Sequence, residues 1–224
     1  MSSLGRVREQ LERYGALLLS DTKLPSVSSL VAGSPVRGSW WGHPRSHEIF
    51  RVTSQLADLK EVVTTKLISG KVTFVHKQLW PALLAVATSR EPWQMRHLSS
   101  SARSLLAEIN KEGHVRTDHF SRRPAVSSKA LPDAARQLER RLLVHAEEFH
   151  TESGAHARIL ESWNHWSQEV KLGKLKISAA EAKQEFEEIV ASLNSHFHAD
   201  AHLPWSLARH RRQEGRRQKA GGRR

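Results

Sequence analysis

Residues 129–163, KALPDAARQLERRLLVHAEEFHTESGAHARILESW, decide the fold that we expect. The first part of this stretch, 129–141, has apolar residues at helical spacing beside a basic side, and it predicts a helix. Residues 142–151 and 157–163 predict two extended segments, which a Glu-Ser-Gly-Ala-His turn at 152–156 joins. We therefore expect a helix that is followed by a β-hairpin.

The segment before this stretch supplies another helix. Serine caps its start and glycine follows its end, so we expect a helix over 99–112. A short element at 114–120 and a basic loop that contains Arg122 and Arg123 lead to the next helix. The order of elements over residues 98–163 is helix, short element, helix and hairpin. This order resembles a winged-helix domain, which is a variant of the helix-turn-helix.

The resemblance to winged-helix domains implies a role for each element. In that family the second helix enters the major groove of DNA, and the hairpin wing reaches the backbone or the minor groove. Residues 129–141 would then be the recognition helix, with Ala134, Ala135 and Leu138 in the core. The side chains that remain for contacts with nucleic acid are Arg136, Gln137, Arg140 and Arg141. Arginine and glutamine fit the edges of guanine and adenine. One alternative is a solvated basic face. Another is contact with a protein, because winged helices also bind proteins.

A similar order precedes this module. Apolar residues at helical spacing predict a helix over 46–60. The segment 61–77 is rich in Val and Thr, and it predicts a hairpin around a two-residue turn at Ser69-Gly70. This pair of elements is consistent with a second, degenerate wing module.

The Ser69-Gly70 turn fixes the expected register of the first hairpin. It would place Val63 and Phe74 on one face, where Phe74 packs against the helix at 46–60. Lys66 and Lys71 would lie on the other face. These two lysines could contact phosphates, or they could form an ordinary solvated face.

The remaining patterns complete an α+β fold that is mostly helical, with winged-helix-like modules, β-hairpin wings and a C-terminal amphipathic helix. Helices are expected over 4–19, over 81–89 and from Ser178 to Phe197, the last with a capping box of Ser178 and Glu181. We divide the chain into an N-terminal helix and connector (1–39), a helix-plus-hairpin module (40–96), a winged-helix-like module (97–167), a C-terminal helix (168–207) and a basic tail (208–224).

The charge of the chain favours a polyanionic partner. The net charge is +12 and the sequence pI is near 10.6. Residues 209–224 hold seven Arg and one Lys against one Glu, with no apolar residue larger than alanine. We expect this tail to be a disordered arm that neutralises phosphates, or else a solubilising extension. The arginines of the tail that we expect at the nucleic acid are Arg211, Arg212, Arg216 and Arg217.

Two adjacent tryptophans, Trp40 and Trp41, lie between Gly38 and Gly42 and precede His43-Pro44. This segment fits neither a helix nor a simple strand. We favour a loop whose rings close the edge of the core, because aromatic side chains dominate small cores. The alternative is an aromatic platform on which a nucleobase could stack.

Several classes of protein are disfavoured. The chain has no cysteine, which removes disulfide scaffolds, thiolate zinc sites and cysteine nucleophiles. The longest apolar run, 82–87, is far shorter than the ~20 residues that span a bilayer, and the N-terminus lacks the layout of a signal peptide. No phosphate-binding loop, dinucleotide-binding turn, serine nucleophile elbow or zinc-protease helix is present. His196, His198 and His202 form a cluster with metal-ligating side chains, but its spacing matches no named motif.

One class of enzyme is similar in architecture, namely the winged-helix DNA glycosylases with their repeated wing modules and basic surface. The activity of that family depends on a Gln-x-Gln or Gln-x-Asp pair that positions water. The glutamines of this chain, such as those in Gln94-Met-Arg and Gln137-Leu-Glu, do not match this pattern. We therefore expect a non-enzymatic nucleic-acid-binding protein with duplex DNA as partner and no cofactor, metal or membrane. We place it in the cytoplasm, at the nucleoid, or in the nucleus of a eukaryote. The alternatives are a protein-interaction adaptor and, more remotely, a glycosylase-like enzyme.

Overall fold

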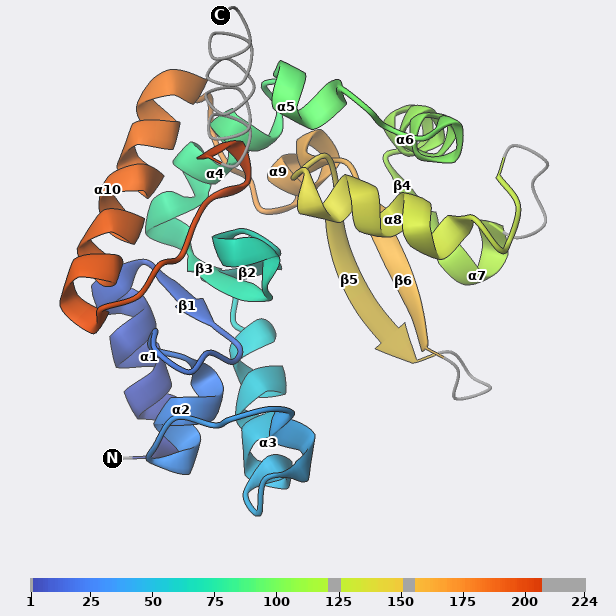
Figure 1. The fold of residues 1–224 in the computed structure, drawn as a ribbon. Coiled ribbons are helices and arrows are strands. Elements are labelled where there is room, and N and C mark those ends of the chain that lie inside the picture. Colours follow the sequence, from blue (N-terminus) through green and yellow to red (C-terminus); the bar gives the residue numbers. More distant parts are fainter. Residues whose placement is uncertain (1, 121–125, 151–155, 207–224) are drawn as a thin grey trace, which may run out of the picture.

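The structure is a computed structural model that describes residues 2–120, 126–150 and 156–206. The fold is mixed α+β and 55% helical, as expected. The described residues form two three-stranded antiparallel sheets, one in each half of the chain (Figure 1). None of their helices combines the length and the apolar character that crossing a membrane requires.

The first half contains three helices and one sheet. In chain order it runs α1 (Ser3–Tyr14), β1 (Ala16–Leu18), α2 (Val27–Ala32), α3 (Ser46–Ala57), β2 (Val62–Thr65) and β3 (Thr73–His76). Strand β3 lies in the centre of the sheet, because both β1 and β2 pair with it. Residues on both sides of the expected boundary at 39/40 therefore belong to one sheet.

The second half repeats this order. It runs α6 (Ser100–Glu112), β4 (His114–Arg116), α7 (Thr117–Phe120), α8 (Leu131–Arg140), β5 (His145–His150) and β6 (His156–Glu161). The last strand, β6, is again central, between β4 and β5. The expected hairpin is confirmed, and so are the Ser99 cap and the glycine end of α6.

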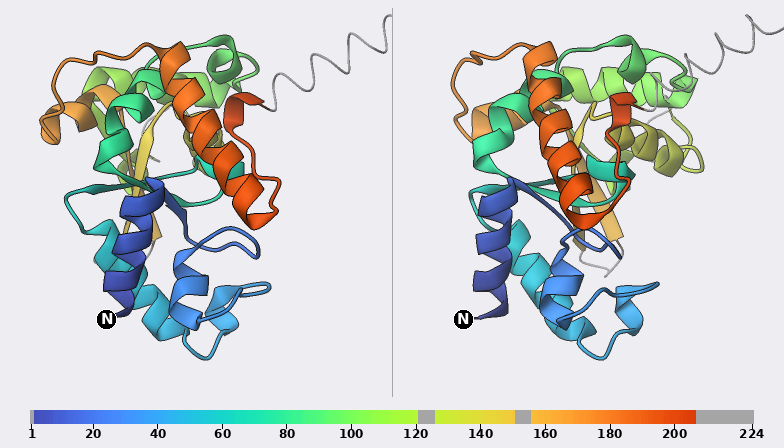
Figure 2. Two further views of the ribbon diagram at one scale, coloured as in Figure 1. Left: turned by 90° about the vertical axis from the view of Figure 1, so that its left-hand side faces the viewer. Right: turned by 60° about the vertical axis from the view of Figure 1, so that its left-hand side comes forward.

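Four further helices join and cover the two halves. They are α4 (Trp80–Ala87) and α5 (Pro92–Met95) between the halves, and α9 (Trp163–Glu169) and α10 (Ala179–Phe197) after them. Helix α10 begins with the predicted capping box and packs along α4 (Figure 2). Its apolar stripe buries Phe186, which contacts the ring of Trp205 in the segment that follows.

The expected helix over 4–19 is too long. Helix α1 ends at Tyr14, and Gly15 follows in a left-handed conformation with φ of 72°. A Cβ at this position would come within 2.6 Å of Leu79 Cδ1, so glycine is needed for both conformation and space. Residues Ala16–Leu18 then form β1, a strand that the sequence analysis missed.

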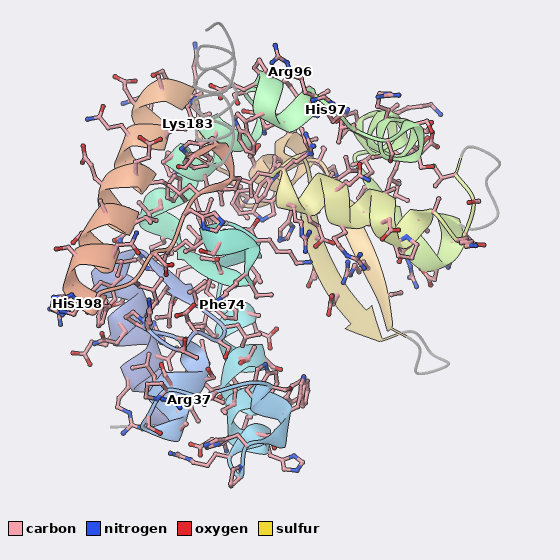
Figure 3. The ribbon with its side chains drawn as sticks, viewed as in Figure 1. Arg37, Phe74, Arg96, His97, Lys183 and His198 are labelled. Carbon is pink, nitrogen blue, oxygen red and sulfur yellow. The ribbon has the colours of Figure 1, made fainter. Side chains whose placement is uncertain are left out.

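The expected register of the first hairpin is also wrong. A two-residue turn would place Val63 and Phe74 on one face, but Val63 pairs with Val75 and Thr64 pairs with Phe74. The reason is a longer connection that contains a 3-10 turn at Ile68–Gly70, in which Ile68 is itself buried. The predicted burial of Phe74 is nevertheless confirmed, since it lies in one apolar cluster with Ile49 and Leu56 of α3 (Figure 3).

A buried carboxylate ties the two halves together. Glu139 of α8 is only 6% exposed, and it forms ion pairs with Lys66 of the first half and with Arg158 of β6. The distance from Arg158 Nη1 to Glu139 Oε1 is 2.7 Å. Strand β2 also approaches β5 closely, so the two sheets meet at this point.

Candidate nucleic-acid interface

Helix α3 has one buried face and one outward face. Ile49, Val52 and Leu56 are buried in the N-terminal core. The outward side chains are His47, Phe50, Arg51 and Gln55, which recur at spacings of three and four residues and are all exposed. This stripe combines a cation, an aromatic ring and polar groups on one surface.

The segment before α3 adds an aromatic pair to this surface. Trp40 and Trp41 lie in a 3-10 turn at Trp40–Gly42, and their rings stack with centroids 4.0 Å apart and an angle of 25° between the planes. Trp41 is 62% exposed and its ring lies 5.7 Å from that of Phe50, which is 48% exposed. Trp40 packs against the N-terminal core, so the expectation that the rings close a core holds for Trp40 and is wrong for Trp41.

Three of the four charged residues from Arg37 to Arg51, the stretch that contains the aromatic pair, are arginines. Glu48 is engaged internally, since it accepts hydrogen bonds from Ser3 Oγ and from Arg45. These two contacts, that of Ser3 first, lower the pKa of the Glu48 carboxyl. Arg51 and Arg37 are exposed and form no ion pair with any residue that the structure describes. Arg37 lies in the segment that leads from α2 to α3 (Figure 3).

Helix α8 has the same division into two faces. Ala134, Ala135 and Leu138 are buried, as predicted. Arg136 and Arg140 are exposed, and Arg136 forms an exposed ion pair with Asp133 at 2.9 Å.

The other candidate residues of α8 have partners within the fold. Gln137 accepts a hydrogen bond from the backbone N–H of Ser99 at 3.1 Å. The Arg141 guanidinium donates to the carbonyl oxygens of Trp93, Gln94 and Arg96 at the end of α5. Burial lowers the pKa of Arg141. Its geometry is that of a structural cap for α5.

The two candidate lysines of the first hairpin also have partners. Lys66 contacts Glu139, and Lys71 forms an ion pair with Asp21 at 2.6 Å. Burial alone would raise the pKa of Asp21, but hydrogen bonds from Lys71 and two backbone N–H groups lower it. The candidates Arg122, Arg123, Arg211, Arg212, Arg216 and Arg217 lie outside the described residues.

A cluster of imidazoles and carboxylates lies where β6 leads into α9. Glu161 Oε1 is 2.5 Å from His165 Nδ1, and Glu161 Oε2 is 3.3 Å from His145 Nδ1. Burial would raise the pKa of Glu161, but the two histidines outweigh it and lower this pKa, while Glu161 raises the pKa of His165. Glu161, His165 and Glu169 are near enough to one another for one metal ion. The same contacts also fit a purely structural ion-pair cluster, because both carboxylate oxygens of Glu161 already contact a histidine.

The C-terminal histidines do not converge in the same way. His198 is the left-handed C-cap of α10, His196 packs edge-on against Phe197, and His202 lies 3.5 Å from Ser69 Oγ. The three histidines therefore lie in three different local environments and not around one point.

Gln94 is the most buried glutamine of the described chain, and its amide is fully used. Its Oε1 accepts from Ser89 Oγ and from the N–H of Glu91, and its Nε2 donates to the carbonyls of Ala87 and Arg141. An amide with four such bonds has no group left to position a water molecule. This side chain joins α4, α5 and the end of α8.

A family model described as AlkZ related matches residues 2–202. No curated protein and no solved structure matches the chain. The match extends over both sheets and over α10.

Proposed function

The chain belongs to the AlkZ-related family, and from this and the two outward helix faces we propose that it is a nucleic-acid-binding protein with duplex DNA as partner. Both halves would be winged-helix modules, and α3 and α8 would be the helices that face the DNA. AlkZ itself is a glycosylase-like protein of DNA repair. The family therefore supports a nucleic-acid-related function, and the surface of this chain supports binding.

The repeated order of elements carries the proposal. In each half a helix and a short strand precede two helices and a hairpin, and the short strand pairs with the last strand. This is the arrangement in which winged-helix domains present one helix to the major groove. In both halves the helix at that position has a buried apolar face and an outward face that carries exposed arginine.

The division of charges within the fold supports the same assignment. Lys66, Lys71 and Arg141 are held by carboxylates or carbonyls, so they are poorly placed for phosphates. Arg136 and Arg140 are exposed on α8. Asp133, which pairs with Arg136, is itself 74% exposed, whereas the Asp21 that holds Lys71 is 12% exposed. Arginine at such positions can contact phosphates or guanine edges, and its contacts would be strengthened by the positive charge of the whole chain.

A second candidate function is a glycosylase-like reaction on DNA, and the family match is the observation that favours it. The chain lacks the Gln-x-Gln pair, and the amide of Gln94 is fully hydrogen-bonded. Binding without base excision is therefore the function that we propose. Release of a base from a damaged duplex by the folded chain, with none released by heat-denatured chain, would favour the second candidate.

The test is a titration of a fluorescent duplex with the full chain and with the variant Arg136→Ala/Arg140→Ala. We expect the dissociation constant to rise about 10- to 100-fold, since each lost arginine contact is worth ~1 kcal/mol or more. The matched control is Arg6→Ala/Arg13→Ala, which removes the same charge from the exposed side of α1. Equal losses for the two variants would mean that total charge matters and that α8 has no special role.

A further inference from the structure

The outward faces of α3 and α8 differ in chemistry. The face of α8 presents Arg136 and Arg140, which can form hydrogen bonds and ion pairs. The surface at α3 presents Trp41 and Phe50, whose rings offer broad apolar faces for stacking and packing. If both helices face nucleic acid, the two modules recognise different features of it.

Packing within the chain does not explain the position of Trp41. Met95 is the other large apolar side chain that is exposed in the described part of the chain, and it lies apart on α5. Trp41 and Phe50 instead adjoin each other, although they come from different elements. Contiguous exposed apolar groups of this kind mark sites of interaction.

The Trp41 ring is held in place before any ligand arrives. Trp40 covers one side of it and packs against the N-terminal core. The 3-10 turn is closed by hydrogen bonds from the N–H of Gly42 to Ser39 O at 3.2 Å and from the N–H of His43 to Trp40 O at 3.0 Å. A stacking surface that is already ordered loses little entropy on binding.

The polar and cationic side chains on the face of Phe50 match a nucleic-acid strand. His47 and Arg51 lie one helical turn apart on the face of α3 that carries Phe50, and both are exposed. Glu48, the acidic residue of this helix, has its hydrogen bonds with Ser3 and Arg45, although it also attracts Arg51. An aromatic platform beside cations is the arrangement with which proteins bind unpaired strands, since bases stack on the rings and phosphates contact the cations.

We propose that Trp41, supported by Trp40 and Phe50, stacks on an unpaired nucleobase of the bound nucleic acid, while Arg51 contacts an adjacent phosphate. The inference rests on the proposed binding of nucleic acid, and it adds a preference for strands with an unpaired base. The arginine face of α8 would contact the neighbouring duplex. A junction between paired and unpaired DNA is therefore the ligand that fits both faces.

The experiment compares three fluorescent DNAs of one sequence: a duplex, the same duplex with a central unpaired loop, and the single strand. Wild-type chain and Trp41→Ala are titrated with each by anisotropy. We expect Trp41→Ala to weaken binding of the looped duplex and the single strand about 5- to 150-fold, which corresponds to ~1–3 kcal/mol for one stacked base. Binding of the intact duplex should change less than twofold. Trp41→Phe should restore part of the loss, because a phenyl ring still stacks.

Two controls make the result specific. Met95→Ala removes an exposed apolar side chain elsewhere and should leave all three affinities unchanged. The Tm of Trp41→Ala should lie close to that of the wild type, because Trp41 is 62% exposed and lies outside the core clusters.

The outcomes separate the inference from the proposed function. A wild type that binds none of the three DNAs refutes both. A wild type that binds them, with Trp41→Ala equally strong on all or equally weakened on all, refutes the stacking inference and leaves duplex binding intact. Size-exclusion chromatography covers the remaining outcome. If the wild type is a dimer and Trp41→Ala is a monomer, the rings bind a second copy of the chain, and the stacking inference is refuted.

Discussion

Substitution of Phe74 by alanine tests the packing that holds the first module together. The ring is 1% exposed on the central strand β3, where Phe74 pairs with Leu17 of β1 and Thr64 of β2. It packs in one cluster with Ile49 and Leu56 of α3. Any change at this ring therefore acts on both the sheet and the helix.

The expected magnitude follows from this burial. Returning a buried phenylalanine side chain to water costs ~1.5–3 kcal/mol, and the unfilled cavity adds to this, so the total loss is about 3–5 kcal/mol. In a chain of this size that corresponds to a fall in Tm of roughly 6–20 °C. The ring is central and flanked by two strands, which limits how far the cavity can collapse.

The assay is urea unfolding, followed by circular dichroism, of the wild type, Phe74→Ala and the matched control Phe50→Ala. Phe50 is 48% exposed on the outer face of α3, so its loss should cost less than ~1 kcal/mol. A Phe74→Ala variant within 1 kcal/mol of the wild type would refute the packing described for β3 and α3. Equal losses at the two positions would refute the assignment of inner and outer faces to α3.

Three further predictions follow from contacts and charges of the chain. In chemical denaturation, Glu139→Gln should lower the free energy of unfolding by ~1–3 kcal/mol, because the buried carboxylate loses its ion pairs with Lys66 and Arg158. The matched control is Glu148→Gln, which changes a 65% exposed partner of Arg158 and should cost less than ~1 kcal/mol. Deletion of residues 209–224 should flatten the dependence of log affinity on log salt by several units, at about 0.9 for each phosphate that the tail neutralises. An unchanged slope would mean that the tail does not contact the nucleic acid. The Glu161–His165 pair should stabilise the fold most between pH 4.5 and 6.5. The pKa of His165 is raised, so its contribution is lost as pH rises through that pKa, and the pKa of Glu161 is lowered, so its contribution is lost as pH falls through that pKa. A difference in Tm between wild type and His165→Gln that stays constant from pH 5 to 9 would contradict this.

Elements with local signals could be predicted from the sequence. Ser99 and Gly113 mark the ends of α6, and the capping box of Ser178 and Glu181 marks the start of α10. These signals are hydrogen bonds between residues three or four apart, so they depend little on the rest of the fold. The pairing of β5 with β6 was likewise predictable, from two extended segments separated by the sequence Ser-Gly, which lies outside the described residues.

Elements with distant partners could not be predicted in this way. Strand β1 consists of three apolar residues after a helix, and it is a strand only because β3, far along the chain, pairs with it. The register of the first hairpin depends on the burial of Ile68 within the connection, which a turn rule does not anticipate. Strand pairing is thus set by tertiary packing here.

The same limit applies to the candidate interface. Arg136 and Arg140 were placed outward by helical periodicity, and the structure agrees. Lys66 is paired instead with Glu139, a residue of the other half that no local pattern connects to it. The exposure of Trp41 was only the alternative expectation, because a tryptophan pair between glycines is as typical of a core as of a binding surface.

Hydrogen–deuterium exchange with and without a mixed-sequence duplex tests the proposed function most directly. We predict that saturating duplex slows exchange in α8 and α3, and leaves α1 and α10 unchanged. Protection confined to α10, or a complex in which no amide of the described residues is protected, would contradict the proposal that the outward faces of α3 and α8 bind the nucleic acid.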